Sequence, residues 1–144
     1  IDCDPSFADT AKFCSHYGYS PDESANAILL EGKAESPIYA LCVVLATTRI
    51  NVNKVARKRL GTRKASFASA EVTKSLTGME IGGVTPVGLP DDLPIWIDNL
   101  VMEAPKVIIG AGSRDAKIYL APENLLRFPN THIVKGLSMP IVNK

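Results

Sequence analysis

The sequence lacks the features that mark several specialised classes of protein. Its three cysteines, Cys3, Cys14 and Cys42, form no C-x-x-C pair, and an odd number in so short a chain argues against a disulfide framework. The apolar run at residues 41–46 is far below the roughly 20 residues that a membrane-spanning helix needs. No signal-peptide pattern is present, so the sequence predicts a cytoplasmic protein without membrane contact.

Histidine is equally scarce. Cys14 and His16 lie two residues apart without a second pair, and His132 is remote in the sequence. Zinc sites need about four such ligands. No G-x-S-x-G motif or Ser-His-Asp set is evident either. We therefore expect no metal and no cofactor.

The charge is nearly balanced, with a formal net charge of +1. That value excludes a polycation that coats nucleic acid without selectivity. One segment is locally basic, because six Lys and Arg residues fall in positions 54–64 with no acid among them. Lys54, Arg57 and Lys58 are its candidates for contact with an RNA backbone, and a solvated helix face is the alternative interpretation.

The pattern of apolar residues predicts one compact α+β domain spanning residues 1–144. With 46% apolar and 22% charged residues, the composition is that of a globular chain. Short helices and strands alternate irregularly, which favours a mixed sheet over a doubly wound fold. We expect strands at 27–31, 39–47, 95–98, 107–109, 117–120 and 133–134, and helices near 5–17, 20–23, 51–60, 70–77 and 122–128.

Residues 82–90 are rich in Gly and Pro and predict an irregular loop. Gly82 and Gly83 let backbone N–H groups approach a ligand closely, and Pro86 fixes the chain beyond them. Exposed amides of this kind stabilise an oxyanion or hold a polar ligand. An ordinary tight connection is the alternative.

A second glycine-rich segment, residues 110–114, follows an apolar strand. It departs from the dinucleotide-binding pattern, because Asp115 stands where a third Gly or Ala belongs. A strand pattern, not a helix, comes next. The segment therefore predicts a hairpin that presents Arg114.

The loop and its surroundings resemble the YbaK and prolyl-tRNA-synthetase-associated family of aminoacyl-tRNA deacylases. The resemblance is carried by residues 77–88, TGMEIGGVTPVG, in which Gly82 and Pro86 fit the family's G-x-x-x-P motif. Residues 49–56, the strand 95–98 ending in Asp98, and the turn 110–114 give further matches. The similarity runs from near residue 9 to residue 128, and the family's first helix and strand are expected to be missing.

The resemblance implies a mixed β-sheet that curls into a partial barrel, flanked by short helices. It also implies trans hydrolysis of the ester bond of mischarged aminoacyl-tRNA, commonly carrying a small amino acid, with an aminoacyl-tRNA synthetase as a candidate partner and no DNA contact. The residues implied for catalysis are Asn26, Gly82, Gly83 and Pro86, and those for substrate binding are Val84, Thr85, Asp98, Gly110, Gly112 and Arg114.

Asn26 marks a departure from the family. The alignment places it where family members carry a Lys just after a Pro-Asp turn. An Asn amide donates hydrogen bonds but brings no positive charge. Two functions follow: a deacylase with a variant mechanism, or a non-catalytic module that binds aminoacyl-tRNA or a similar adenosine-ended ligand. Lys33 and Lys54 are the cations available elsewhere, although their spacing does not support either.

Overall fold

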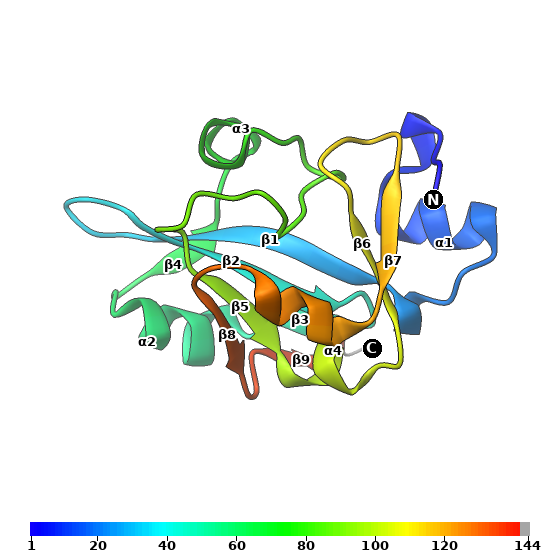
Figure 1. The fold of residues 1–144 in the computed structure, drawn as a ribbon. Helices are drawn as coiled ribbons and strands as arrows, with labels where there is room; N and C mark the ends of the chain where they lie inside the picture. Colours follow the sequence, from blue (N-terminus) through cyan, green and yellow to red (C-terminus); the bar gives the residue numbers. More distant parts are fainter. Residues whose placement is uncertain (142–144) are drawn as a thin grey trace.

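The computed structural model describes residues 1–141, and its elements follow one another as short helices and strands (Figure 1). The helices are η1 Pro5–Phe7, α1 Thr10–Tyr17, η2 Pro21–Glu23, η3 Val52–Ala56, α2 Arg57–Leu60, α3 Ala70–Thr77, α4 Asn99–Glu103 and η4 Pro122–Arg127. The strands are β1 Ala25–Gly32, β2 Ile38–Leu45, β3 Thr48–Ile50, β4 Ala65–Phe67, β5 Ile95–Asp98, β6 Val107–Gly110, β7 Lys117–Leu120, β8 Thr131–Val134 and β9 Ser138–Pro140.

The main sheet has five strands in the order β4-β1-β2-β5-β8. β1 pairs antiparallel with β4 and β2, whereas β5 pairs parallel with β2 and β8. The predicted α+β class with a mixed sheet is therefore confirmed. Two-stranded sheets β3-β9 and β6-β7 accompany it. The expected curl into a partial barrel does not follow from these pairings and stays a prediction.

Both faces of the main sheet are covered, which explains the continuous apolar run of β2. Successive side chains of a strand point to opposite faces. Leu41 and Val43 accordingly lie in the larger core cluster with Val107 and Ile109 of β6. Cys42 and Val44 lie in a second cluster, in which Trp96, Ala56 and Leu60 also pack.

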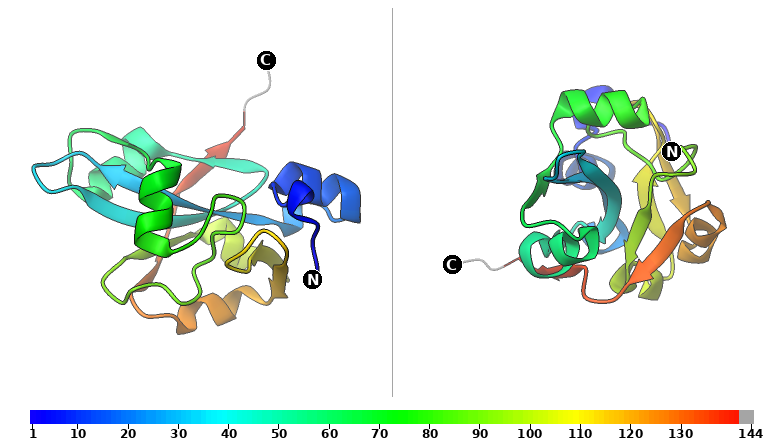
Figure 2. Two further views of the ribbon diagram at one scale, coloured as in Figure 1. Left: turned by 90° about the horizontal axis from the view of Figure 1, so that it is seen from above. Right: turned by 90° about the vertical axis from the view of Figure 1, so that its left-hand side faces the viewer.

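A third cluster attaches the N-terminal segment to the β6-β7 hairpin. Phe13 and Cys14 of α1 pack with Ile108 of β6. The backbone of Asp2 bridges to Ala116, and the N–H of Cys3 donates to the Asp115 carbonyl at 2.8 Å. α1 and the hairpin consequently lie together at one end of the molecule, while α2 lies at the other (Figures 1 and 2).

Every predicted strand and helix is present, but some boundaries and types differ. The helix expected from residue 51 begins as a π-helical turn, η3, before α2, and the helix after residue 122 is 3-10. The strand expected to reach residue 47 ends at Leu45, because a turn leads directly into β3. The unpredicted elements β3, β4, α4 and β9 have three to five residues, too few for a periodic pattern.

No helix within residues 1–141 has the length and apolar character to cross a membrane.

Candidate functional site

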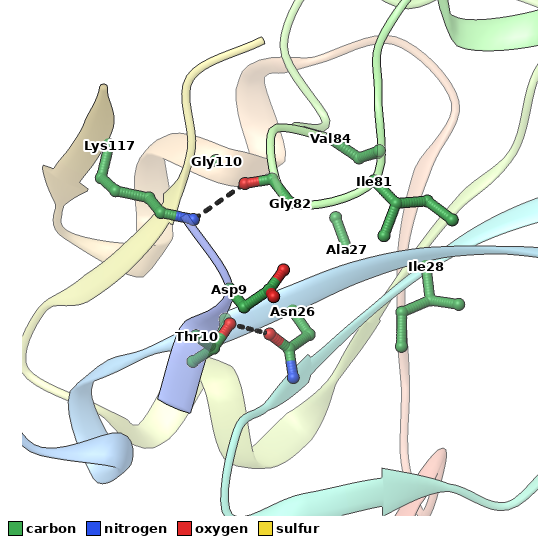
Figure 3. Close-up of a pocket in the computed structure, with 11 residues that line it drawn as sticks. Asp9, Thr10, Asn26, Ala27, Ile28, Ile81, Gly82, Val84, Gly110 and Lys117 are labelled. Atoms are coloured by element: carbon green, nitrogen blue, oxygen red, sulfur yellow. Dashed lines mark hydrogen bonds between the residues drawn. The ribbon is translucent and has the colours of Figure 1, made fainter. Parts of the chain in front are cut away.

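A pocket of about 280 Å³ opens where the first half of β1 meets α1, the glycine-rich loop and the hairpin (Figure 3). Four segments that are distant in sequence contribute to its wall. The lining residues are Asp9, Thr10, Ala25, Asn26, Ala27, Ile28, Ile81, Gly82, Val84, Gly110 and Lys117. Of the predicted site residues, the pocket brings together Asn26, Gly82, Val84 and Gly110.

The two glycine-rich segments lie against each other. A Cβ atom on Gly110 would be 2.2 Å from the Val84 carbonyl oxygen, and one on Gly83 would be 2.7 Å from the Ser113 carbonyl carbon. The Gly112 N–H donates to the Gly83 carbonyl at 2.8 Å. Glycine is therefore required at positions 83 and 110 for close approach of two backbones, and Gly112 fixes the contact from outside the pocket.

The backbone amides of the loop are not all available. The Gly83 N–H donates to the Glu80 carbonyl at 2.9 Å, within a turn. Within residues 1–141, the N–H groups of Gly82 and Val84 have no protein acceptor. Both amides are thus free to bind a carbonyl oxygen.

Thr85 and Pro86 belong to the loop but do not line the pocket. Both are buried, Thr85 with 3% of its surface exposed. Pro86 stiffens the chain directly after the amides, because its ring fixes φ. The structure thus places these two predicted residues as supports of the loop.

Asn26 faces the pocket from β1. Its Oδ1 accepts a hydrogen bond from the Thr10 hydroxyl at the start of α1 (Figure 3). In the described part of the chain its Nδ2 has no partner, so both amide N–H groups remain available for a ligand. The expected role of Asn26 as a hydrogen-bond donor stays a prediction.

Lys117, which the sequence reasoning missed, also lines the pocket. Only 7% of its surface is exposed. Its Nζ donates to the Ala8 carbonyl at 2.7 Å. It also donates to the Gly82 carbonyl at 2.9 Å (Figure 3). Burial lowers the pKa of Lys117 from its usual value. A lone Lys at the start of a short strand gives no local signal of burial.

Arg114 lies behind the pocket wall. Its guanidinium donates to the Ile81 carbonyl at 2.7 Å and the Pro5 carbonyl at 3.0 Å. It also lies 3.5 Å from the Asp9 carboxylate. The sequence predicted Arg114 as a substrate-binding residue. In the structure its guanidinium instead bonds to carbonyl groups of the protein's own backbone.

A second, apolar cavity of about 200 Å³ adjoins the first. The two share Ala27, Ile28, Ile81 and Val84. Its remaining lining residues are Leu29, Phe67, Ala68 and Thr73. The site thus consists of a polar pocket beside an apolar chamber.

Asp98 does not reach the pocket. It is completely buried, and its carboxylate accepts hydrogen bonds from the Ser138 N–H at 3.2 Å and the Ser138 hydroxyl. These bonds hold β9 against the end of β5. The structure therefore gives Asp98 a structural position, where the sequence predicted a substrate-binding residue.

The basic segment is also remote. The Leu60 and Thr62 side chains occupy the space that a Cβ on Gly32 would take, at the opposite end of β1 from Asn26. Six residues of strand span about 20 Å. Lys54 and Lys58 are exposed, whereas Arg57 donates to the carbonyls of Asn53 at 2.9 Å and Thr62 at 3.0 Å. Their contact with tRNA stays a prediction.

The comparisons with known proteins show the family of the chain. The sequence model of the aminoacyl-tRNA editing domain matches residues 4–128. The chain belongs to the aminoacyl-tRNA editing domain family. Among curated proteins it is 32% identical over 111 residues to YwhH of Bacillus subtilis (strain 168), covering 77% of this chain and 68% of YwhH.

Other relatives carry names that refer to editing. EbsC of Enterococcus faecalis (strain ATCC 700802 / V583), described as a candidate Cys-tRNA(Pro)/Cys-tRNA(Cys) deacylase, is 27% identical over 99 residues, which is 69% of this chain and 58% of EbsC. A solved structure described as a candidate trans-editing enzyme for prolyl-tRNA synthetase is 22% identical, with a TM-score of 0.79 over 94% of this chain and 83% of that one.

The protein APE2540 is also 22% identical, with a TM-score of 0.83, and covers 96% of this chain and 89% of that one. At these identities, the two solved structures support the fold alone.

Proposed function

We propose that this chain hydrolyses the ester bond of mischarged aminoacyl-tRNA in trans. The observation that carries the proposal is the polar pocket, whose lining brings Gly82 and Val84 together with Asn26 and Lys117. Within residues 1–141 the N–H groups of Gly82 and Val84 have no protein acceptor. Membership of the aminoacyl-tRNA editing family supports the same substrate class.

The chemistry requires a group that stabilises negative charge on the ester carbonyl. Attack by water converts that carbonyl to a tetrahedral oxyanion. Collapse of the oxyanion breaks the bond to the ribose oxygen, which takes up the proton that the water has lost. The amides of Gly82 and Val84 are fixed donors, since their loop is held against Gly110. Donors held in place before the reaction lower the barrier most effectively.

The apolar chamber suits the side chain of the amino acid. Its volume of about 200 Å³ exceeds what a methyl group fills, and Thr73 brings its only polar side chain. We therefore expect uncharged amino acids as substrates. Discrimination among them is limited, because one methylene in such a pocket is worth about 1–3 kcal/mol.

The direct test is deacylation of a panel of mischarged tRNAs that includes Ala-, Cys- and Ser-tRNAPro. Release of one amino acid above the spontaneous rate supports the proposal and names the substrate. If none is hydrolysed while mischarged tRNA still binds, the alternative is right and the chain is a non-catalytic binding module, as the replacement of the family Lys by Asn26 allows.

The proposal carries further expectations about partners and location. An aminoacyl-tRNA synthetase is the expected partner, because tRNA selectivity can be supplied by a bound synthetase. We expect action in the cytoplasm, where charged tRNAs are made and used, with no binding to DNA or to membranes.

A further inference from the structure

Two basic side chains of the same hairpin region tie the same two segments together. Lys117 bonds to the carbonyls of Ala8 and Gly82, and Arg114 to those of Pro5 and Ile81. Each thus joins the N-terminal segment to the glycine-rich loop, across more than 100 residues of sequence for the N-terminal contact.

The two side chains differ in where their charge lies. Arg114 is not part of the pocket wall, whereas Lys117 is. Among the described residues that line the pocket, Lys117 alone carries a positive charge. A Lys ammonium has three N–H donors, and two of them are used by Ala8 and Gly82. One donor therefore remains on an ammonium that already contacts the Gly82 carbonyl.

We propose that Lys117 supplies, from β7, the positive charge that stabilises the oxyanion in this pocket, in place of the cation that Asn26 does not provide on β1. The inference rests on the proposed function and names a residue of that same site. In it, the pair of electrons displaced from the carbonyl double bond onto oxygen is stabilised by the Lys117 ammonium together with the loop amides. Its proton stays on Nζ throughout.

The surroundings of Lys117 bear on its protonation. Besides the two carbonyls, Cys3, Cys14, Asp9 and Arg114 face it, and the Phe13 ring lies 5.6 Å from Nζ. Burial is the largest effect and lowers the pKa of Lys117, with Arg114 acting in the same direction and Asp9 in the opposite one. Because the charged form is the active one, the rate should fall as the pH rises through this lowered pKa.

The test compares Lys117→Met with Arg114→Met on the tRNA that the wild-type protein deacylates best. Both variants lose one link between the N-terminal segment and the loop, but only Lys117→Met removes the charge from the pocket. We expect Lys117→Met to lower kcat by about 10²–10³-fold, and Arg114→Met to lower it several-fold. Thermal unfolding of both variants measures how much stability is lost when one link between the N-terminal segment and the loop is removed.

Two further variants separate charge from structure. Lys117→Arg keeps a charge that does not titrate, so it should retain part of the activity and lose the alkaline fall in rate. Asn26→Lys added to Lys117→Met should recover activity, because it returns a cation to the same pocket. If Lys117→Met and Arg114→Met lower kcat equally, at equal thermal stability, the inference is overturned while the deacylase function stands. A wild-type protein inactive on every tRNA would instead overturn the proposed function, and the inference with it.

Discussion

A Cβ atom on Gly110 would lie 2.2 Å from the carbonyl oxygen of Val84. The backbone of β6 thus lies so close to the glycine-rich loop that position 110 has no room for a side chain. It also explains how a loop with few hydrogen bonds of its own holds its amides in a fixed direction. The hairpin acts as the support of the loop.

Gly110→Ala should therefore displace the loop and remove most of the deacylase activity. The displaced amides of Gly82 and Val84 would no longer match the oxyanion, and loss of one such donor typically costs about 10²–10³-fold in rate. Gly88→Ala is the matched control, because no atom lies within 4 Å of its added Cβ and only its positive φ of 76° is strained. It should cost about 1–2 kcal/mol of stability with little change in rate. The deacylation rates and unfolding free energies of the two variants test this. A similar loss of rate in both would contradict a specific role of Gly110.

Asn26→Ala should lower the deacylation rate by up to about 10²-fold, because it removes the two free amide N–H donors of the pocket. Thr10→Val is the milder control, since it removes only the hydroxyl that orients Asn26. A wild-type rate in Asn26→Ala would place Asn26 outside the mechanism. Activity found only after Asn26→Lys would show that the natural chain binds without hydrolysing.

Neutralising Lys54 and Lys58 should weaken tRNA binding and flatten its salt dependence. For each phosphate that is no longer neutralised, the slope of log K against log salt should decrease in magnitude by about 0.7–0.9. We choose these two side chains because Arg57 also bonds to the backbone of Asn53 and Thr62. Replacement of the exposed Lys106 and Lys135 by Gln gives a control of the same net charge. Equal slopes in the two double variants would contradict RNA binding through η3 and α2.

Enlarging Ala27 should change which amino acid is removed. Ala27 lines both the polar pocket and the apolar chamber, so Ala27→Val narrows the passage between them. The value of kcat/KM should fall more for larger aminoacyl groups than for alanine. The difference should correspond to about 1–3 kcal/mol of activation free energy per excluded methylene. Rates on Ala-tRNA and a bulkier aminoacyl-tRNA measure the ratio. An unchanged ratio would mean that the amino acid does not enter the chamber.

The buried Cys42 should make the protein sensitive to alkali. Burial raises the pKa of its thiol from 9.0 to about 12. Above pH 9 the unfolded chain releases this proton while the folded chain keeps it, so stability falls as the pH rises from about 9 toward 12. The loss is up to about 1.4 kcal/mol per pH unit.

Urea unfolding of the wild type and Cys42→Ala at pH 8 and pH 10.5 measures this effect. The difference in stability between the two proteins should narrow by about 2 kcal/mol at the higher pH. Tyr39, whose pKa is raised by its hydrogen bond to Glu31, is present in both proteins and cancels. A constant difference would mean that the thiol is not what titrates.

Much of the fold could be read from the sequence, because its long elements have clear patterns. The apolar run of β2 predicts a strand covered on both faces, and Asn51 marks the start of the helical segment expected from residue 51. The glycine-rich loop and the turn at 110–114 were predicted as site elements from their resemblance to the family, and their glycines allow close backbone contact. Gly82, Val84, Gly110 and Asn26 do meet in one pocket.

What only the tertiary structure decided is how charge is placed around that pocket. Nothing local distinguishes Lys117 from an exposed lysine, because its burial depends on Ala8 and Gly82, residues 109 and 35 positions away. Asp98, at the end of a strand, resembled a site residue, yet it bonds to Ser138, 40 positions away. Local sequence determines backbone conformation through steric limits and periodic burial. The surroundings of a single charged side chain come from contacts distant in sequence, and only the folded chain brings these together.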